Sequence, residues 1–162
     1  MSEPLEVQFR ESHDSPIGKV WFSFSPDGEL LAIDLPGGDR LRAKGVRPRG
    51  APTRPQVGKW LSTFMKGAPC DFPGPWRMPG HSPFMSKVYR YVGRIPVGHT
   101  KSYSEVAQAC GSPRACRAVG TAMAQNPMPL LVPCHRVLAK DGMGGFAGGL
   151  EQKADLLAIE AG

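Results

Sequence analysis

The chain has 162 residues, enough for one domain or two small ones with a buried core, and 41% of them are hydrophobic. No apolar run approaches the roughly 20 residues that cross a bilayer, and residues 1–4 lack the apolar core of a signal peptide. The formal net charge is +6, and most of the excess comes from one stretch of the chain. We therefore expect a soluble, cytoplasmic protein that does not interact with membranes.

Residues 1–79 predict a small α+β domain with an antiparallel sheet. Short strands are expected at 7–9, 19–25 and 29–35, joined by turns that contain Ser, Pro and Gly. The alternation of such turns with short apolar runs is typical of a meander.

A loop, a helix and a linker complete this first domain. Residues 37–55 are rich in Gly, Pro and Arg and predict an irregular loop. Apolar residues then recur with helical spacing over 57–65, and Gly67 is suited to end that helix. Residues 68–80 hold four prolines and two glycines, so we interpret them as the linker to a second domain.

Residues 80–162 predict a second, mostly helical domain. Ser82 stands before a proline, which is the usual arrangement of an N-cap and a first helical residue. Ser102 and Glu105 have the spacing of a capping box, which predicts the start of another helix.

A third helix is expected over residues 112–124, where Ser112 and Pro113 again have the arrangement of an N-cap and a first helical residue. Gly111 separates it from the helix before, and two short helices joined by a tight glycine turn outline a helix-turn-helix. Arg114, Arg117 and Thr121 would share the outer face of this helix. A core helix with a charged outer edge would give the same pattern.

Basic residues concentrate ahead of the C-terminus. Residues 82–136 contain seven lysines and arginines against a single acidic residue, Glu105. A nucleic acid or another polyanion would fit such a surface, although a solvated basic face would look the same in the sequence. The seven basic residues are Lys87, Arg90, Arg94, Lys101, Arg114, Arg117 and Arg136.

Cys134 stands directly beside His135. A thiolate is the form of cysteine that attacks carbon, and a neighbouring imidazole can take its proton. A buried cysteine beside a solvated histidine would give the same dipeptide. Neither cysteines nor histidines show metal-ligand spacing, so we expect free thiols and no metal or other cofactor.

A larger set of residues carries a family resemblance. In chain order they are Tyr103, Arg117 to Gly120, Asn126, Pro133 to Val137, Gly148 to Leu150, Lys153 and Glu160. With this order and spacing, residues 82–162 resemble the O6-alkylguanine-DNA alkyltransferases, or methylated-DNA–protein-cysteine methyltransferases. The resemblance implies a ribonuclease H-like first domain, which residues 1–79 match more loosely.

The resemblance implies DNA repair by direct reversal. The alkyl group of O6-alkylguanine, and of O4-alkylthymine, would pass irreversibly to Cys134, so that each enzyme molecule is used once. His135 would deprotonate Cys134 through a water, and Glu160 would orient His135. Tyr103 would donate a proton or hydrogen bond to N3 of the base, and Asn126 would tie the recognition helix to the active-site loop.

The resemblance also implies a monomer that binds double-stranded DNA in the minor groove and flips the damaged base out of the stack. Arg117 matches the arginine that fills the gap left by the base. Further DNA contacts are expected from Arg114, Ala118, Gly120, Thr121 and Lys101, and from the basic loop over 37–55. The base pocket is expected to include Val137, Phe146, Ala147 and Arg136.

The chain departs from the family pattern at two pocket positions. Phe146 stands where the family commonly has tyrosine, and Ala147 replaces a serine of some members. No cysteine precedes Cys70, so the structural zinc of some relatives is not supported.

Three other functions remain open from the sequence. Alkyltransferase-like proteins bind lesions without transfer, but they carry tryptophan at the position of Cys134. A helix-turn-helix regulator would need no Cys-His-Glu set. A cysteine hydrolase would need a cleft for acyl groups, which nothing in the sequence indicates.

Overall fold

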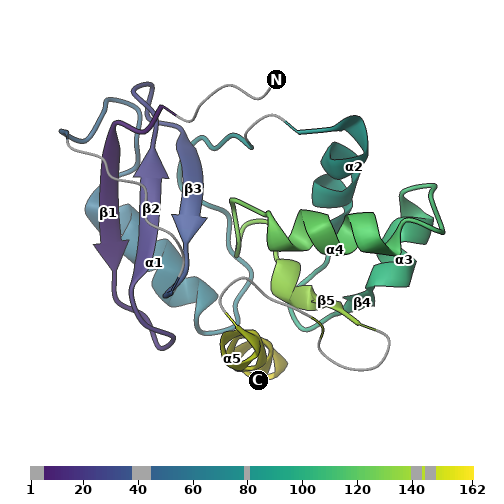
Figure 1. The fold of residues 1–162 in the computed structure, drawn as a ribbon. Helices are drawn as coiled ribbons and strands as arrows, with labels where there is room; N and C mark the ends of the chain where they lie inside the picture. The colour runs from purple at the N-terminus through teal and green to yellow at the C-terminus, as the bar shows by residue number, and fades with distance from the viewer. Residues whose placement is uncertain (1–5, 38–44, 79–80, 140–143, 145–148) are drawn as a thin grey trace.

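The first half of the chain forms a three-stranded antiparallel sheet, β1 (Phe9–His13), β2 (Val20–Phe24) and β3 (Leu30–Asp34), in the order β1-β2-β3 (Figure 1). The computed structural model describes residues 6–37, 45–78, 81–139, 144 and 149–162. The first strand begins at Phe9 and runs to His13, so the expected strand over 7–9 was placed too early.

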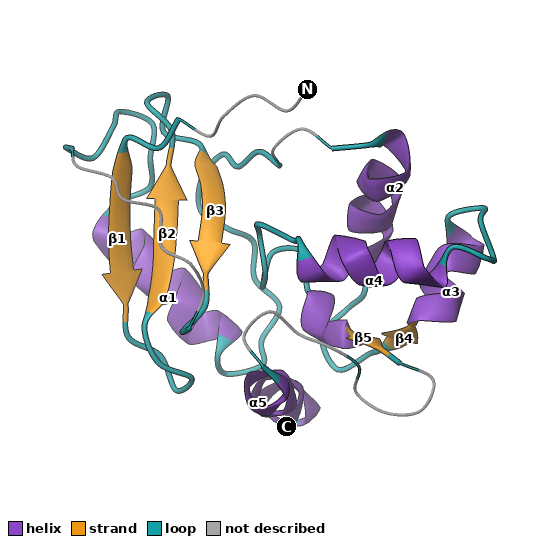
Figure 2. Ribbon diagram, in the orientation of Figure 1, coloured by secondary structure: helices purple, strands orange, loops and turns teal. Residues whose placement is uncertain are grey.

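One helix covers a face of the sheet (Figure 2). Helix α1 (Arg54–Phe64) starts three residues before the predicted start, because Thr53 and the side chain of Gln56 form a capping box that the sequence analysis overlooked. Its buried residues include Trp60, whose ring meets Phe22 of β2 edge-on at 6.1 Å. Gly67 ends this region in the left-handed conformation, with φ of +74°, as glycine allows at little cost.

The segment predicted to be a linker adds to the sheet. Leu30 of β3 accepts from Arg77 N–H at 3.0 Å and donates to the Pro75 carbonyl at 2.9 Å, so that Trp76 forms a parallel bridge with Leu30. Farther along β3, Ile33 N–H donates to Pro127 of the second half at 2.9 Å. The outer edge of β3 is therefore paired, which ties both the linker and the second half to the sheet.

The second half is mostly helical. Ser82 caps α2 (Pro83–Val92) and the predicted capping box of Ser102 and Glu105 opens α3 (Tyr103–Ala109), so both predicted starts are confirmed. The remaining elements are β4 (Lys101–Ser102), α4 (Cys116–Ala124), the 3-10 helix η1 (Cys134–Arg136), β5 (Val137–Leu138) and α5 (Leu150–Ala161), with β4 and β5 parallel.

The predicted helix over 112–124 begins late, at Cys116. Gly111 N–H bonds the Gln108 carbonyl and Ser112 N–H bonds the Ala107 carbonyl, which together make a Schellman motif. Ser112 therefore closes α3 instead of capping α4, whose start at Ala115 has no side-chain cap.

Helix α5 runs beside both halves (Figure 1). The Gln152 side chain donates to the Pro36 carbonyl at 2.8 Å, and the Ile159 carbonyl would lie only 2.6 Å from a Cβ added at Gly67. The buried core is continuous from the sheet into the helical half. The chain is thus a mixed α+β protein, and within the described residues no helix is long and apolar enough to cross a membrane.

Candidate active site

The loop before η1 is built around the side chain of Asn126. The Asn126 amide donates to the Val132 carbonyl at 2.8 Å and its oxygen accepts from Met128 N–H at 3.0 Å. Inside this loop, Leu130 takes the left-handed conformation with φ of +78°, which costs free energy for a residue with a branched side chain. The two Asn126 hydrogen bonds therefore stabilise a strained loop that leads directly to Cys134.

Cys134 begins η1 and is only 3% exposed. Burial raises the pKa of its thiol, although the Asn126 amide and the positive charge of Lys153 act in the opposite direction. The resting sulfur is therefore protonated at neutral pH, and its activation requires a base.

His135 can serve as that base. Its ring is fully buried, its Nε2 lies 2.9 Å from Glu160 Oε2, and it packs edge-on with Phe64 of α1, with ring centroids 6.2 Å apart. Burial lowers the pKa of His135 even though Glu160 favours the charged form. A neutral imidazole that donates from Nε2 to a carboxylate leaves Nδ1 as an acceptor, and this buried Nδ1 has no partner among the described residues.

Glu160 stays ionised inside the protein. Burial alone would raise the pKa of Glu160, but hydrogen bonds from Arg136 and His135 outweigh it and hold that pKa at about 2. The carboxylate is 3% exposed and accepts from Arg136 Nε at 2.7 Å and Nη2 at 2.5 Å. From the sequence, only the resemblance predicts Glu160 beside His135, and the structure brings the two side chains together.

Arg136 holds the carboxylate in place from the next position along η1. Besides its two bonds to Glu160, its Nη1 donates to the Ile95 carbonyl at 2.6 Å. All three guanidinium nitrogens of Arg136 thus donate hydrogen bonds within the protein. The role of Arg136 in a base pocket stays a prediction.

Lys153 is a buried residue of the site that carries part of the family resemblance but has no predicted role from the sequence. Its ammonium donates to the Val137 carbonyl at 2.7 Å, and its side chain is fully buried. Burial lowers the pKa of Lys153, while the nearby Cys134 favours the charged form. Its spacing of three residues from Leu156 on the apolar face of α5 was the available signal, because a lysine on such a face must find a buried partner.

The pairing of β4 with β5 places Tyr103, the first residue of α3, near the site. Lys101 pairs with Val137 and Ser102 with Leu138, so the start of α3 lies beside the segment that follows Cys134. Tyr103 is half-buried, and a Cβ added at Gly144 would lie 2.8 Å from its hydroxyl oxygen. Of the predicted pocket residues, Val137 is buried here, whereas Phe146 and Ala147 lie outside the described residues.

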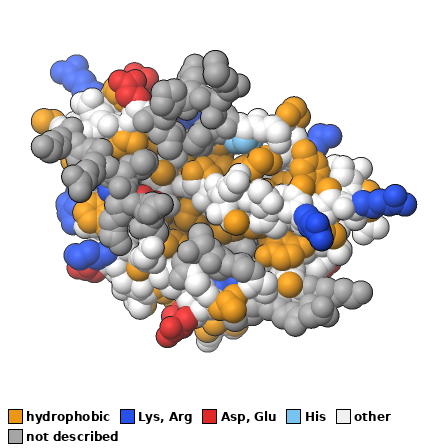
Figure 3. Space-filling model, viewed as in Figure 1, with side chains coloured by type: hydrophobic (Ala, Val, Ile, Leu, Met, Phe, Trp, Pro, Cys, Tyr) orange, Lys and Arg blue, Asp and Glu red, His pale blue; other side chains and the backbone are white. Residues whose placement is uncertain are grey.

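The outer face of α4 is exposed and basic. Arg114, Arg117 and Thr121 are exposed as predicted, and Thr121 donates to the Arg117 carbonyl within the helix. Lys and Arg side chains project over α4 and its turn with α3 in the space-filling view (Figure 3). A Cβ at Gly120 would meet nothing within 4 Å, which leaves this face open to close approach, and Ala118 beside it is half-buried.

The other predicted DNA contacts come from Lys101 and from the basic loop, and both have acidic partners. Lys101 pairs with Glu105 at 3.9 Å, a distance typical of a weak surface ion pair. Of the basic loop predicted over 37–55, residues 38–44 lie outside the described residues. Arg47 lies 2.8 Å from Glu11, and Arg54, the first residue of α1, lies 3.1 Å from it, so both are engaged within the first half. Within the described ranges, no group of three or more Cys, His, Asp or Glu could hold a metal ion.

These features define a mixed α+β protein with a buried thiol, imidazole and carboxylate behind a basic helix. A family model described as the DNA binding domain of 6-O-methylguanine DNA methyltransferase matches residues 83–162. The constitutive methylated-DNA–protein-cysteine methyltransferase of Bacillus subtilis is 41% identical over 111 residues, which cover 67% of each chain. The methylated-DNA–protein-cysteine methyltransferase of Mycolicibacterium paratuberculosis is 48% identical over 80 residues, or 49% of this chain and 48% of that protein.

The fold agrees with the sequence matches. The crystal structure of Mycobacterium tuberculosis OGT in complex with DNA superimposes with a TM-score of 0.80 at 30% identity, covering 94% of this chain and 92% of that one. The chain spans about half the length of the first curated relatives that it matches. It belongs to the methylated-DNA–protein-cysteine methyltransferase family.

Proposed function

We propose that the chain repairs DNA by moving the alkyl group of O6-alkylguanine onto Cys134, in a single turnover. The observation that carries this proposal is the neutral, buried His135, which donates from Nε2 to ionised Glu160 and presents an acceptor at Nδ1. Cys134 is the adjacent residue, and its raised pKa makes a base necessary.

The chemical step is a displacement at the alkyl carbon. The thiol proton passes to His135 Nδ1 through a bridging water, and the imidazolium that forms is stabilised by Glu160. The sulfur of Cys134 attacks the alkyl carbon as the bond from that carbon to O6 breaks, and the electron pair stays with guanine. Tyr103 donates its phenolic proton to N3 of the base and recovers a proton from solvent. The thioether at Cys134 has no route back to the thiol, so the protein acts once.

Access to the base requires a DNA-binding surface. We infer that α3, the turn at Gly111 and α4 act as a helix-turn-helix, with α4 in the minor groove of double-stranded DNA. Arg117 fills the place of the flipped base, and the small residues Ala118 and Gly120 permit close approach. In this proposal the first half has a ribonuclease H-like fold, and the protein works as a cytoplasmic monomer.

The second candidate is a lesion-binding protein without transfer. The presence of Cys134 at the start of η1 favours transfer, because the residues that supply the thiol and the imidazole are consecutive in the chain and both are buried. O4-alkylthymine is a secondary substrate of the proposed transfer, since it presents the same kind of exocyclic alkyl ether.

Binding and transfer can be separated with Cys134→Ser. We expect this variant to bind a duplex with one O6-methylguanine as tightly as the unmodified protein does, and to transfer no methyl group. Labelled methyl from the duplex should appear on the unmodified protein alone. Tight, lesion-selective binding by the unmodified protein without any labelled protein would leave the lesion-binding function instead.

A further inference from the structure

Helix α2 carries a second cluster of cations, on the face away from the core. Lys87, Arg90 and Arg94 are exposed, and none of them forms an ion pair with a residue that the structure describes. Lys87 and Arg90 are one helical turn apart, and Arg94 follows in the turn after the helix, where its N–H donates to the Tyr91 carbonyl at 3.0 Å. Three cations are thus held close together on one surface.

The three cations surround a hollow of about 440 Å³ between α2 and the end of α3. No acidic side chain is among the described residues that line it. Gly111 forms part of the far wall in the left-handed conformation, and a Cβ there would meet nothing within 4 Å, so the wall is open. The lining is completed by Tyr91, Ala109 and Cys110.

The charge of this hollow fits a phosphodiester backbone. Like charges gathered without counter-charges repel one another, and the repulsion is relieved when an anion binds. Between residues 82 and 136 the only acidic side chain is Glu105, which lies beside Lys101. Arginine and lysine around an open surface are typical of sequence-independent contacts to phosphates.

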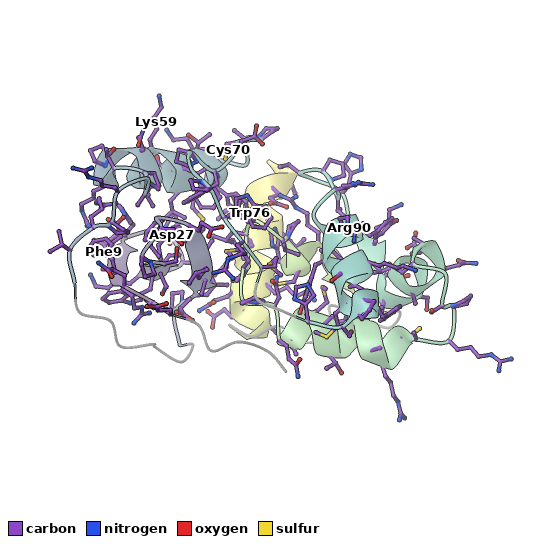
Figure 4. The ribbon with its side chains drawn as sticks, turned by 90° about the horizontal axis from the view of Figure 1, so that it is seen from above. Phe9, Asp27, Lys59, Cys70, Trp76 and Arg90 are labelled. Atoms are coloured by element: carbon purple, nitrogen blue, oxygen red, sulfur yellow. The ribbon has the colours of Figure 1, made fainter. Side chains whose placement is uncertain are left out.

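This hollow does not lie on the DNA-facing side proposed for α4. The inner face of α2 packs toward α4, since Tyr89 donates from its hydroxyl to the Ala122 carbonyl at 2.9 Å. Ala122 lies on the buried face of α4, opposite Arg117 and Thr121. The two helices meet through their inner faces, so their outer faces point apart, and Figure 4 shows Arg90 on the side of α2 away from α4.

We propose that Lys87, Arg90 and Arg94 hold the backbone of a second DNA segment while α4 holds the first. This inference rests on the proposed DNA-binding function. A protein that can hold two segments can pass from one to the other without becoming free, which speeds the search for rare lesions.

The test is the dissociation of the protein from a labelled undamaged duplex at increasing concentrations of unlabelled duplex. Transfer through a two-duplex intermediate makes the dissociation rate rise several-fold with competitor, whereas simple dissociation is independent of it. The variant with Lys87→Gln, Arg90→Gln and Arg94→Gln should dissociate at a rate that competitor does not change. Glutamine has nearly the helix propensity of lysine and arginine, so α2 is expected to remain folded.

A matched control removes three exposed cations of the first half that lie outside the basic loop, as Lys19→Gln, Lys59→Gln and Lys66→Gln. This control should keep the competitor-dependent rate, and both variants should methylate Cys134 at the unmodified rate. The inference is overturned if competitor leaves the unmodified protein's rate unchanged, or if both triple variants lose the effect equally. Failure of the proposed function is distinct, because the unmodified protein would then transfer no methyl group from a damaged duplex.

Discussion

Arg136 donates hydrogen bonds to both carboxylate oxygens of Glu160, with Nε 2.7 Å from Oε1 and Nη2 2.5 Å from Oε2. The same Oε2 accepts from His135 Nε2 at 2.9 Å. One buried carboxylate therefore serves an arginine and a histidine that are neighbours in the chain. The ion pair keeps Glu160 ionised, and an ionised Glu160 fixes which nitrogen of His135 is free to act as a base.

Arg136→Lys should slow transfer while leaving DNA binding unchanged. Lysine keeps the charge but cannot make the paired, planar contacts of a guanidinium, so Glu160 would lose its fixed orientation. We expect the single-turnover rate to fall about tenfold, corresponding to about 1.4 kcal/mol of lost positioning. Rapid-quench assays at saturating protein measure this rate. An unchanged rate would show that Arg136 contributes only to stability.

Glu160→Gln should alter the acid stability of the protein. The folded pKa of Glu160 is about 2, against 4.5 for the free side chain, so its contribution is complete above pH 4.5 and is lost as the pH falls from 4.5 toward 2. Between pH 4.5 and pH 3 the unmodified protein should lose about 2 kcal/mol that the variant does not lose. Urea unfolding across this range provides the comparison, and parallel losses would contradict the depressed pKa.

At pH 7 the same variant should be less stable than the unmodified protein. Glutamine cannot neutralise the buried guanidinium of Arg136, and breaking a buried pair from one side costs about 3–5 kcal/mol. Urea titration at pH 7 measures the difference. Equal stability would mean that water reaches Arg136 once the carboxylate is removed.

The rate of transfer should be nearly constant from about pH 6.5 up to the raised pKa of Cys134. The pKa of His135 lies below 6.5, so neutral His135 is available throughout this range and is lost only at more acidic pH. In His135→Gln the rate should instead rise about tenfold per pH unit, because only the small ionised fraction of the thiol reacts. Single-turnover rates from pH 5.5 to 9 test both profiles. A rising profile for the unmodified protein would exclude His135 as the base.

Arg117→Ala should impair flipping more than binding. Extrusion of a paired base costs a few kcal/mol, so the loss of a residue that fills the gap should slow transfer about tenfold or more. Arg114→Ala is the matched control, since it removes an exposed cation nearby and should weaken binding without changing the rate at saturating protein. Placing a mismatched base opposite the lesion should restore much of the Arg117→Ala rate. If Arg117→Ala transfers at full rate, Arg117 has no part in flipping.

Local sequence signals predicted the start of a helix correctly where the capping serine could take part in only one local structure. Ser82 and Ser102 cap the helices that they were expected to cap. Ser112 could either cap the next helix or close α3. Its N–H bonds the Ala107 carbonyl and closes α3, so α4 starts only at Cys116. Short-range patterns do not show which of two competing sets of hydrogen bonds is formed.

The residues proposed to carry the chemistry of the site could be predicted from the sequence, but the contacts that hold them in place could not. The resemblance supplied Cys134, His135 and Glu160, and the geometry brings the last two into contact. The packing of Phe64 on His135 depends on how the two halves of the chain meet, which no local pattern encodes. Likewise, the hydrogen bond from Arg136 to Glu160 joins residues 24 positions apart, which a local pattern cannot predict.

The most direct measurement is the mass of the protein after reaction with a duplex that contains one O6-methylguanine. The account predicts that each protein molecule gains one methyl group in place of the thiol proton, that the gain maps to the peptide containing Cys134, and that excess substrate adds no more. An unchanged mass after stoichiometric binding, or a methyl group on another residue, would contradict it.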